Sequence, residues 1–155
     1  MKGNKKVIDT LNNLLSDELT AVNQYMVHAK MCGSWGYVKL YEAIEKRAIQ
    51  EMKHAEELIA RVLFLGGIPV VNVLKKIEIG SDVAQMIEND YAAEEGAIRD
   101  YNKAVALTGD EGDNGSADLV ATILLDEEAH ADWLEAQLAQ IGQMGIQNYL
   151  VEQLR

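Results

Sequence analysis

The sequence predicts an all-α protein: a four-helix bundle with one long crossover connection and a short fifth helix at the C-terminus. The 155 residues are rich in Ala, Leu, Ile and Glu and include one proline, Pro69, a composition that favours helices. Apolar residues recur at spacings of three and four along four long segments. Short connections join the first segment to the second and the third to the fourth, whereas the middle connection is long enough to run the length of a bundle.

The first two helices are expected at residues 5–32 and 39–65. Glycines follow the first helix, and a Gly-Gly-Ile-Pro run at residues 66–69 stops the second, because glycine and proline interrupt a helix.

The remaining helices are bounded in the same way. Asp82, followed three residues later by Gln85, resembles a capping box at the start of the third helix. Gly145 separates the fourth helix from the last one. We therefore expect an extended crossover at 68–80, a third helix up to about residue 107, a loop at 109–116, a fourth helix at 117–143 and a short amphipathic helix at 147–154.

Length and charge narrow the functional classes. A chain of 155 residues is expected to form one domain, residues 1–155. Its net charge of −11 opposes binding to nucleic acid. The longest apolar run is too short to span a membrane, and the N-terminus lacks the apolar stretch of a signal peptide. A single cysteine, Cys32, excludes an internal disulfide framework and suits a reducing compartment, so we expect a cytoplasmic protein.

Each long helix carries a glutamate at the middle of its apolar stripe, and two of these glutamates are followed three residues later by a histidine. The glutamates are Glu18, Glu51, Glu94 and Glu127, and the histidines are His54 and His130. Spacings of three and four place these groups on the same face as the Leu and Ile residues. An unpaired carboxylate in an apolar interior costs several kcal/mol, so four of them require a partner.

The spacing of these residues indicates one shared site. Glu18 and Glu51 are separated by the same length of chain as Glu94 and Glu127, so one constant offset relates each polar residue of the first half to its counterpart in the second. Two similar helical hairpins, paired antiparallel, would bring four Glu and two His together around a pseudo-two-fold axis.

Two metal ions suit this set of side chains. We find no basic residue at the stripe midpoints, and four negative charges match two divalent cations or two ferric ions with a bridging oxide. Carboxylates with one imidazole per metal suit iron or manganese better than copper(I) or zinc. A Glu from each of two helices, with a Glu-x-x-His from each of the others, is the ligand pattern of di-iron carboxylate bundles.

These residues and the stretches around them resemble the bacterioferritins over nearly the whole chain. The matching stretches are MKGNKKVIDTLNNLLSDELTAVNQY, EMKHAEELIARVLFLGGIP, DEEAHADWLE and the tail MGIQNYL. The resemblance implies a ferritin-like fold and a ferroxidase that oxidises Fe(II) with O2 or peroxide. It also implies storage of ferric mineral in a homo-oligomeric shell of 24 subunits.

The same resemblance implies a di-iron centre with a role for each residue. Its ligands would be Glu18 and Glu94 as terminal carboxylates, Glu51 and Glu127 as bridging carboxylates, and His54 and His130 as imidazoles, one per iron. At the positions of Lys46 and Gln50, members of the family often carry His and Asp that hold an additional iron on the inner surface. This chain lacks those ligands.

The resemblance further implies a haem b at each two-fold subunit contact, with Met52 of both partners as axial ligands. From the residues alone, Met52 lies about 100° around the helix from Glu51 and points off the core stripe, as an ordinary interface methionine also does. Tyr25 lies on the face of Glu18 and is expected either to hydrogen-bond a ligand or to pack in the core. His28 has no partner at metal-binding spacing.

Two alternatives stay open at this point. A smaller di-iron oxidase or peroxidase would act on an organic substrate or peroxide without storing mineral. A non-catalytic interaction bundle would satisfy its acids with water. The sequence leaves open the oxidant, the electron donor for iron release, the route of the iron, the haem occupancy, and whether the iron centre is a stable cofactor or a transit site. It also leaves open whether a second subunit type co-assembles.

Overall fold

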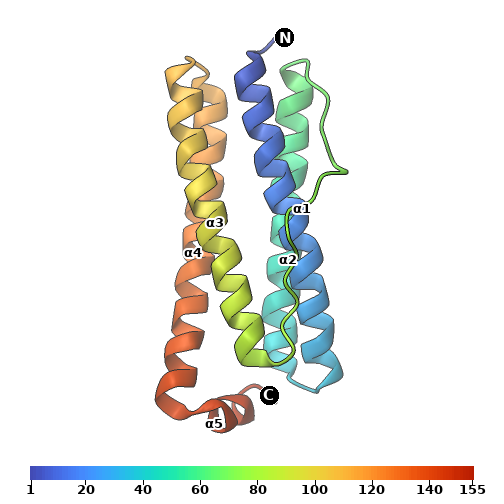
Figure 1. The fold of residues 1–155 in the computed structure, drawn as a ribbon, viewed down its shortest axis with the longest axis vertical. Helices are drawn as coiled ribbons and strands as arrows, with labels where there is room; N and C mark the ends of the chain where they lie inside the picture. Colours follow the sequence, from blue (N-terminus) through green and yellow to red (C-terminus); the bar gives the residue numbers. More distant parts are fainter.

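The computed structural model describes residues 1–155 and consists of helices and the segments that connect them. The helices are α1 (Lys5–Ser34), α2 (Val38–Phe64), α3 (Val83–Asp110), α4 (Asn114–Met144) and α5 (Ile146–Val151). The four long helices form a bundle, and α5 lies across one end of it (Figure 1). The predicted all-α bundle with a short fifth helix is confirmed. None of the helices combines the length and apolar character needed to cross a membrane.

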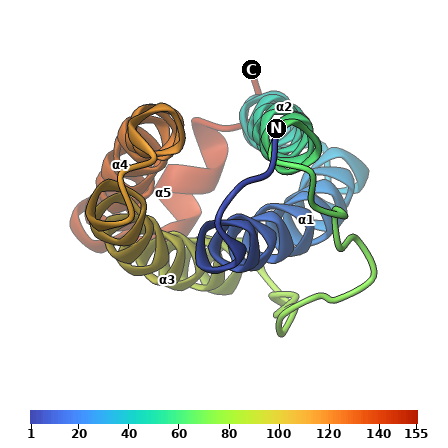
Figure 2. The same ribbon diagram turned by 90° about the horizontal axis from the view of Figure 1, so that it is seen from above.

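Two antiparallel hairpins build the bundle. Helix α1 packs against α2, and α3 packs against α4; seen along the bundle, the four helices stand at four corners (Figure 2). The connection between the hairpins, residues 65–82, runs along the outside from the end where α2 stops to the opposite end, where α3 begins (Figure 1). This is the long crossover that the unequal connections predicted.

The apolar stripes bury two clusters, one in each half of the bundle. One cluster includes Leu11 and Leu58, and the other includes Ile87 and Leu134, all at most 1% exposed. Full burial of such a side chain contributes about 1.5–3 kcal/mol. On every long helix the mid-stripe glutamate lies between residues of the two clusters, so the polar residues occupy the boundary between two apolar cores.

The helix ends lie close to their predicted positions, with two differences. Helix α3 extends to Asp110 and α4 begins at Asn114, so the loop expected at 109–116 is a tight turn. The side chain of Asp113 explains the early start, because it accepts a hydrogen bond from the Ser116 backbone N–H (3.0 Å) and caps α4. Helix α5 ends at Val151, three residues earlier than expected.

The predicted cap of α3 and the predicted helix stops are present. Asp82 Oδ1 accepts a hydrogen bond from the Gln85 N–H (2.9 Å), but the Gln85 side chain returns to the N–H of Ser81 (2.7 Å), one residue earlier than in a capping box. Gly66 and Gly145 both have φ of 78°, a left-handed conformation that favours glycine.

The crossover has no regular secondary structure, yet side chains of α1 hydrogen-bond its backbone at regular intervals. These side chains recur every four residues along one face of α1: Asn12, Ser16, Thr20, Gln24 and His28. They bond, in order, to the main chain of Ile68 and Val70, Val73, Lys75, Glu78 and Gly80, at 2.7 to 3.1 Å. We call this row of five side chains the α1 ladder. It satisfies backbone groups of a segment that has no helix or sheet partner, from exposed groups at Ile68 to the buried N–H of Gly80.

His28 is the last member of the ladder and is fully buried. Its Nε2 accepts a hydrogen bond from the Gly80 N–H (2.9 Å), so its Nδ1 carries the proton and donates to Asp90 on α3 (2.8 Å). Gln24 also donates to Asp90 (2.8 Å). His28 therefore ties the crossover and α1 to α3.

Replacing His28 with Leu should destabilise the protein by about 2–4 kcal/mol, because Asp90 loses a partner and the Gly80 N–H is left buried without an acceptor. Thermal unfolding measures the loss, and hydrogen exchange of residues 76–82 should accelerate. The control is Asn102→Ala, since the exposed Asn102 side chain bonds only the Ile98 carbonyl of its own helix. Unchanged exchange at Gly80 in the Leu variant would contradict the tether.

Candidate metal centre

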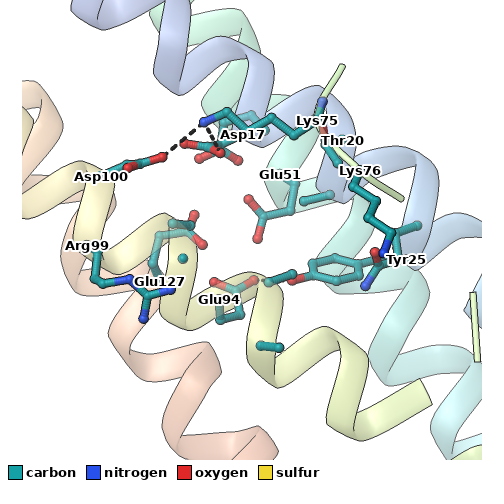
Figure 3. A pocket seen from close by; sticks show the side chains of 17 residues that line it. Asp17, Thr20, Tyr25, Glu51, Lys75, Lys76, Glu94, Arg99, Asp100 and Glu127 are labelled. Carbon is teal, nitrogen blue, oxygen red and sulfur yellow. Dashed lines mark hydrogen bonds and ion pairs between the residues drawn. The ribbon is translucent and has the colours of Figure 1, made fainter. Parts of the chain in front are cut away.

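Six polar side chains from all four long helices converge at the middle of the bundle. They are Glu18, Glu51, His54, Glu94, Glu127 and His130, and none is more than 9% exposed. Figure 3 shows Glu51, Glu94 and Glu127 pointing toward one another from α2, α3 and α4. The structure thus brings together all the residues that the mid-stripe positions singled out.

The six side chains form two overlapping groups, within each of which the possible ligand atoms lie within 4.8 Å of one another. The first group, the His54 half, is Glu18, Glu51, His54 and Glu127; the second, the His130 half, is Glu51, Glu94 and His130. Three buried oxygens, one each on Glu18, Glu94 and Glu127, have no hydrogen-bond partner. A buried acceptor without a donor is costly, so this donor set fits cations at its centre.

In the His54 half, the imidazole is held by an acid on its outer side. His54 Nε2 lies 2.9 Å from Asp126 Oδ2, and Asp126 is 44% exposed. Nδ1 of the same ring faces the carboxylates, 3.1 Å from Glu127, 3.4 Å from Glu51 and 3.6 Å from Glu18. A hydrogen bond to the outer nitrogen fixes the ring so that the inner nitrogen is available to a metal.

The His130 half is built differently. His130 Nδ1 lies 2.8 Å from Glu94 Oε1, and the imidazole stacks on the ring of Trp133, with centroids 6.0 Å apart and planes at 16°. Trp133 therefore supports the second histidine from the side, and no carboxylate outside the six takes the part that Asp126 plays for His54.

Two tyrosines donate hydrogen bonds to carboxylates of the site. Tyr101 on α3 donates to Glu18 Oε1 on α1 (2.5 Å), and Tyr25 on α1 donates to Glu94 Oε1 on α3. Of the two roles considered for Tyr25, it has both, since its ring also packs in the core. The offset between the two tyrosines is the same as that between Glu18 and Glu94, so each hairpin orients the glutamate of the other.

The stripe midpoints carry no basic residue, but a basic side chain reaches the acids from one turn away, which the sequence did not reveal. Arg47 on α2 is 7% exposed, and its Nε donates to Glu51 Oε1 (2.8 Å). Its Nη2 lies 3.1 Å from Glu127 Oε2 and 3.9 Å from Glu94 Oε2. Arg47 precedes Glu51 by one helical turn, and its long side chain carries the charge from there into the site.

Burial shifts the protonation of the whole site. Desolvation raises the pKa of Glu18 and of Glu51 to about 7 and raises the pKa of Glu94 well above its usual range. Burial alone lowers the pKa of His54, but the surrounding carboxylates of Glu127, Glu18 and Glu51 outweigh this effect and raise that pKa. The pKa of His130 is lowered by burial, with Arg47 adding to the shift. Metal ions therefore compete with bound protons for these carboxylates.

A cavity of about 330 Å³ leads toward the carboxylates from between α1 and α3. Most of its lining residues are polar or charged, and it reaches Glu18, Glu51, Glu94 and Glu127. Lys75 of the crossover reaches over this cavity, where it donates to Asp17 on α1 and to Asp100 on α3 (2.9 Å) (Figure 3). The site is thus connected to the outside by a polar passage that an ion pair spans.

Met52 lies apart from this centre, as its position on the helix predicted. Its side chain is 36% exposed on the outside of α2, whereas Glu51 is 1% exposed. Ile49, one turn earlier, is 48% exposed, so a thioether and an apolar side chain share this part of the surface.

Three functional neighbours were not foreseen from the sequence: Tyr101, Asp126 and Arg47. On sequence alone Tyr101 is an apolar member of its stripe, although its offset from Tyr25, equal to that between the paired glutamates, was a usable signal. Asp126 and Arg47 have no such counterpart, because position 50 is Gln and position 123 is Ile. Their roles become visible only when the side chains are placed in space.

A carboxylate and histidine site in the middle of a bundle with one long crossover is the architecture of the ferritin-like proteins. The profile of the ferritin-like domain family matches residues 8–144. The chain is 42% identical to a bacterial ferritin of Paramagnetospirillum magnetotacticum, over 97% of this chain and 93% of the relative. It is 40% identical to a bacterial ferritin of Pseudomonas aeruginosa over 99% and 100%, and 38% identical to a bacterioferritin of Rhodobacter capsulatus over 96% and 92%.

The chain therefore belongs to the ferritin-like domain family and, within it, to the bacterioferritins.

The metal-free protein should lose stability as the pH rises from about 4.5 to about 7. Glu18 and Glu51 keep their protons in the folded protein up to about pH 7, whereas the unfolded chain releases them near 4.5, so the folded state binds more protons throughout this window. Each carboxyl contributes at most about 3 kcal/mol.

Thermal unfolding of chelator-treated protein at about pH 5 and about pH 7.5 measures this change. Glu18→Gln should flatten the dependence, because an amide does not titrate. A metal-free protein whose stability rises across the window would show that these carboxyls are ionised in the fold.

Proposed function

We propose that this protein is an iron-storing ferroxidase, in which the six central side chains bind two iron ions and promote their oxidation from Fe(II) to Fe(III). The observation that carries the proposal is the set of three partnerless carboxylate oxygens buried beside two imidazoles. Oxygen and imidazole donors in this ratio suit iron. The names of the relatives, bacterial ferritin and bacterioferritin, agree with iron as the substrate.

In this proposal Glu18 and Glu94 would serve as terminal carboxylates, one for each iron, and Glu51 and Glu127 would be shared by the two irons. The imidazoles of His54 and His130 complete one half each. Each Fe(II) gives one electron to O2 or peroxide, and the two irons, held together, deliver their electrons to the same oxidant.

The surrounding residues position the ligands. Tyr101 and Tyr25 hold one oxygen of Glu18 and of Glu94, leaving the second oxygen of each carboxylate free. Asp126 keeps the outer nitrogen of His54 engaged, so that the inner nitrogen faces the iron. We further propose that Fe(II) reaches the centre through the polar cavity between α1 and α3, past Asp17 and Asp100.

We propose that residues 1–155 form one domain, that 24 copies assemble into a cytoplasmic shell holding ferric mineral, and that an electron donor serves iron release. The accessible thioether of Met52 and the apolar side chain of Ile49 beside it support a haem b on the outer surface of α2. Met52 from each of two subunits would ligate the haem iron, and the haem would supply a path for electrons during release.

A smaller di-iron oxidase or peroxidase is the alternative, and the cavity beside the carboxylates is the observation that favours it. The polar lining of that cavity suits an inorganic cation better than an organic substrate. Native mass separates the two functions, because a shell of 24 chains of 17.1 kDa has a mass of roughly 410 kDa.

Glu94→Ala should abolish rapid Fe(II) oxidation while the native mass stays unchanged, because the variant loses a terminal ligand but no surface residue. Stopped-flow absorbance of ferric species measures the rate. Glu95→Ala is the matched control, since it removes the exposed neighbouring carboxylate and should keep the wild-type rate. Rapid oxidation by the Glu94 variant would refute the site.

Met52→Leu should remove haem absorbance and leave Fe(II) oxidation intact, because Leu keeps the volume but offers no thioether. The visible spectrum of the purified, haem-reconstituted protein measures binding. Ile49→Leu, on the same surface, should retain haem. Stoichiometric haem in the Met52 variant would exclude this residue as the axial ligand.

A further inference from the structure

Arg47 places a permanent positive charge inside the carboxylate cluster. The guanidinium is buried, with its Nε 2.8 Å from Glu51 and its Nη2 3.1 Å from Glu127. Glu94 Oε2, which has no hydrogen-bond partner, lies 3.9 Å from the same Nη2. Three of the four carboxylates therefore face this one cation, and Glu18 does not.

Arg47 contacts the carboxylates on the side that faces away from His54. Glu51 and Glu127 each present one oxygen to His54 and the other to Arg47: Glu51 uses Oε2 for His54 and Oε1 for Arg47, and Glu127 uses Oε1 and Oε2 in the same way. Glu94, which belongs only to the His130 half, faces Arg47 as well. The guanidinium thus occupies the side of Glu51 and Glu127 that is turned away from His54 and toward Glu94.

We propose that Arg47 is an internal counter-cation that competes with metal for the His130 half, so that the two halves of the centre bind metal with unequal affinity. This inference rests on the proposed two-metal function. The His54 half takes the first ion, and the second ion binds only as the guanidinium withdraws from Glu51, Glu127 and Glu94.

The charge balance gives the physical reason. Four carboxylates neutralise two divalent cations, and a third cation in the same buried space leaves an excess positive charge, which a low-dielectric interior disfavours. The first divalent ion with Arg47 in place leaves the cluster negative. If Arg47 stays in place, adding the second divalent ion gives the cluster a net positive charge.

A groove beside Arg47 has room for its side chain. A groove of about 360 Å³ lies between α2 and α4, lined by Lys46, Arg47, Gln50, His130 and Trp133 among others. Arg47 Nη1 already bonds at this wall, to the Gln50 side chain (2.8 Å) and to the Asp126 carbonyl (3.2 Å). A rotation of the Arg47 side chain toward the groove keeps these partners within reach and releases the carboxylates.

Anaerobic titration of metal-free protein with Co(II), followed by calorimetry and visible absorbance, tests this. Wild type should bind one Co(II) per subunit tightly and a second more weakly by roughly ten- to a hundredfold, the worth of hydrogen bonds to a charged group. Arg47→Gln should bind both ions in one phase. Lys53→Gln, which removes an exposed charge on the same helix that lies outside the groove and touches no carboxylate of the site, should keep two phases.

The titration also separates the possible failures. A single phase of two equal ions in wild type overturns the inference and leaves the two-metal centre standing, and so do two unchanged phases in Arg47→Gln. If Arg47→Gln does not fold without metal, the wild-type titration decides alone. A wild type that binds no Co(II) overturns the two-metal function itself, and the inference with it.

Discussion

The structure depends on one constraint: four carboxylates lie in the interior of an apolar bundle, where an ionised acid is tolerated only beside a donor or a cation. Each carboxylate has a hydrogen-bond donor or a basic side chain beside it. Tyrosines from the opposite hairpin hold Glu18 and Glu94, while His54 and Arg47 share Glu51 and Glu127. The apolar core is divided accordingly, with one cluster in each half of the bundle and the acids between them. The apolar clusters in the two halves of the bundle therefore stabilise the fold, and the titratable side chains gather between them.

The centre combines a symmetric set of carboxylates and imidazoles with asymmetric surroundings. Glutamates, histidines and tyrosines repeat with one constant offset along the chain, so the two hairpins contribute equally. Asp126 and Arg47 do not repeat: one places an acid behind His54, and the other places a cation in front of Glu94. An anion behind an imidazole strengthens it as a ligand, whereas a cation beside a carboxylate weakens its attraction for a metal. Two halves built from the same residue types thus differ in the residues that surround them.

The sequence predicted the parts of the structure that follow from local periodicity. Spacings of three and four located the helices and put the six central residues on core faces, and the unequal connections predicted the crossover. Arg47 was missed because a residue one turn from Glu51 can direct a long side chain inward or outward, and spacing alone does not decide which. Tyr101 looked apolar because a tyrosine ring fills a stripe as well as a leucine does. The α1 ladder was missed because its partners are backbone groups of a segment that has no period of its own.

Surface loops usually tolerate changes in length, but the crossover is joined to α1 by hydrogen bonds from a row of side chains on a four-residue interval. Lys75 sits within that row, with its N–H on Thr20 and its ammonium group on Asp17 and Asp100. A one-residue insertion between two rungs would shift every later partner and carry the ammonium group away from the polar passage. The four-residue interval of the side chains on α1 thereby sets the length of the crossover. The Lys75 ammonium group stays over the polar passage only while the crossover and α1 keep this register.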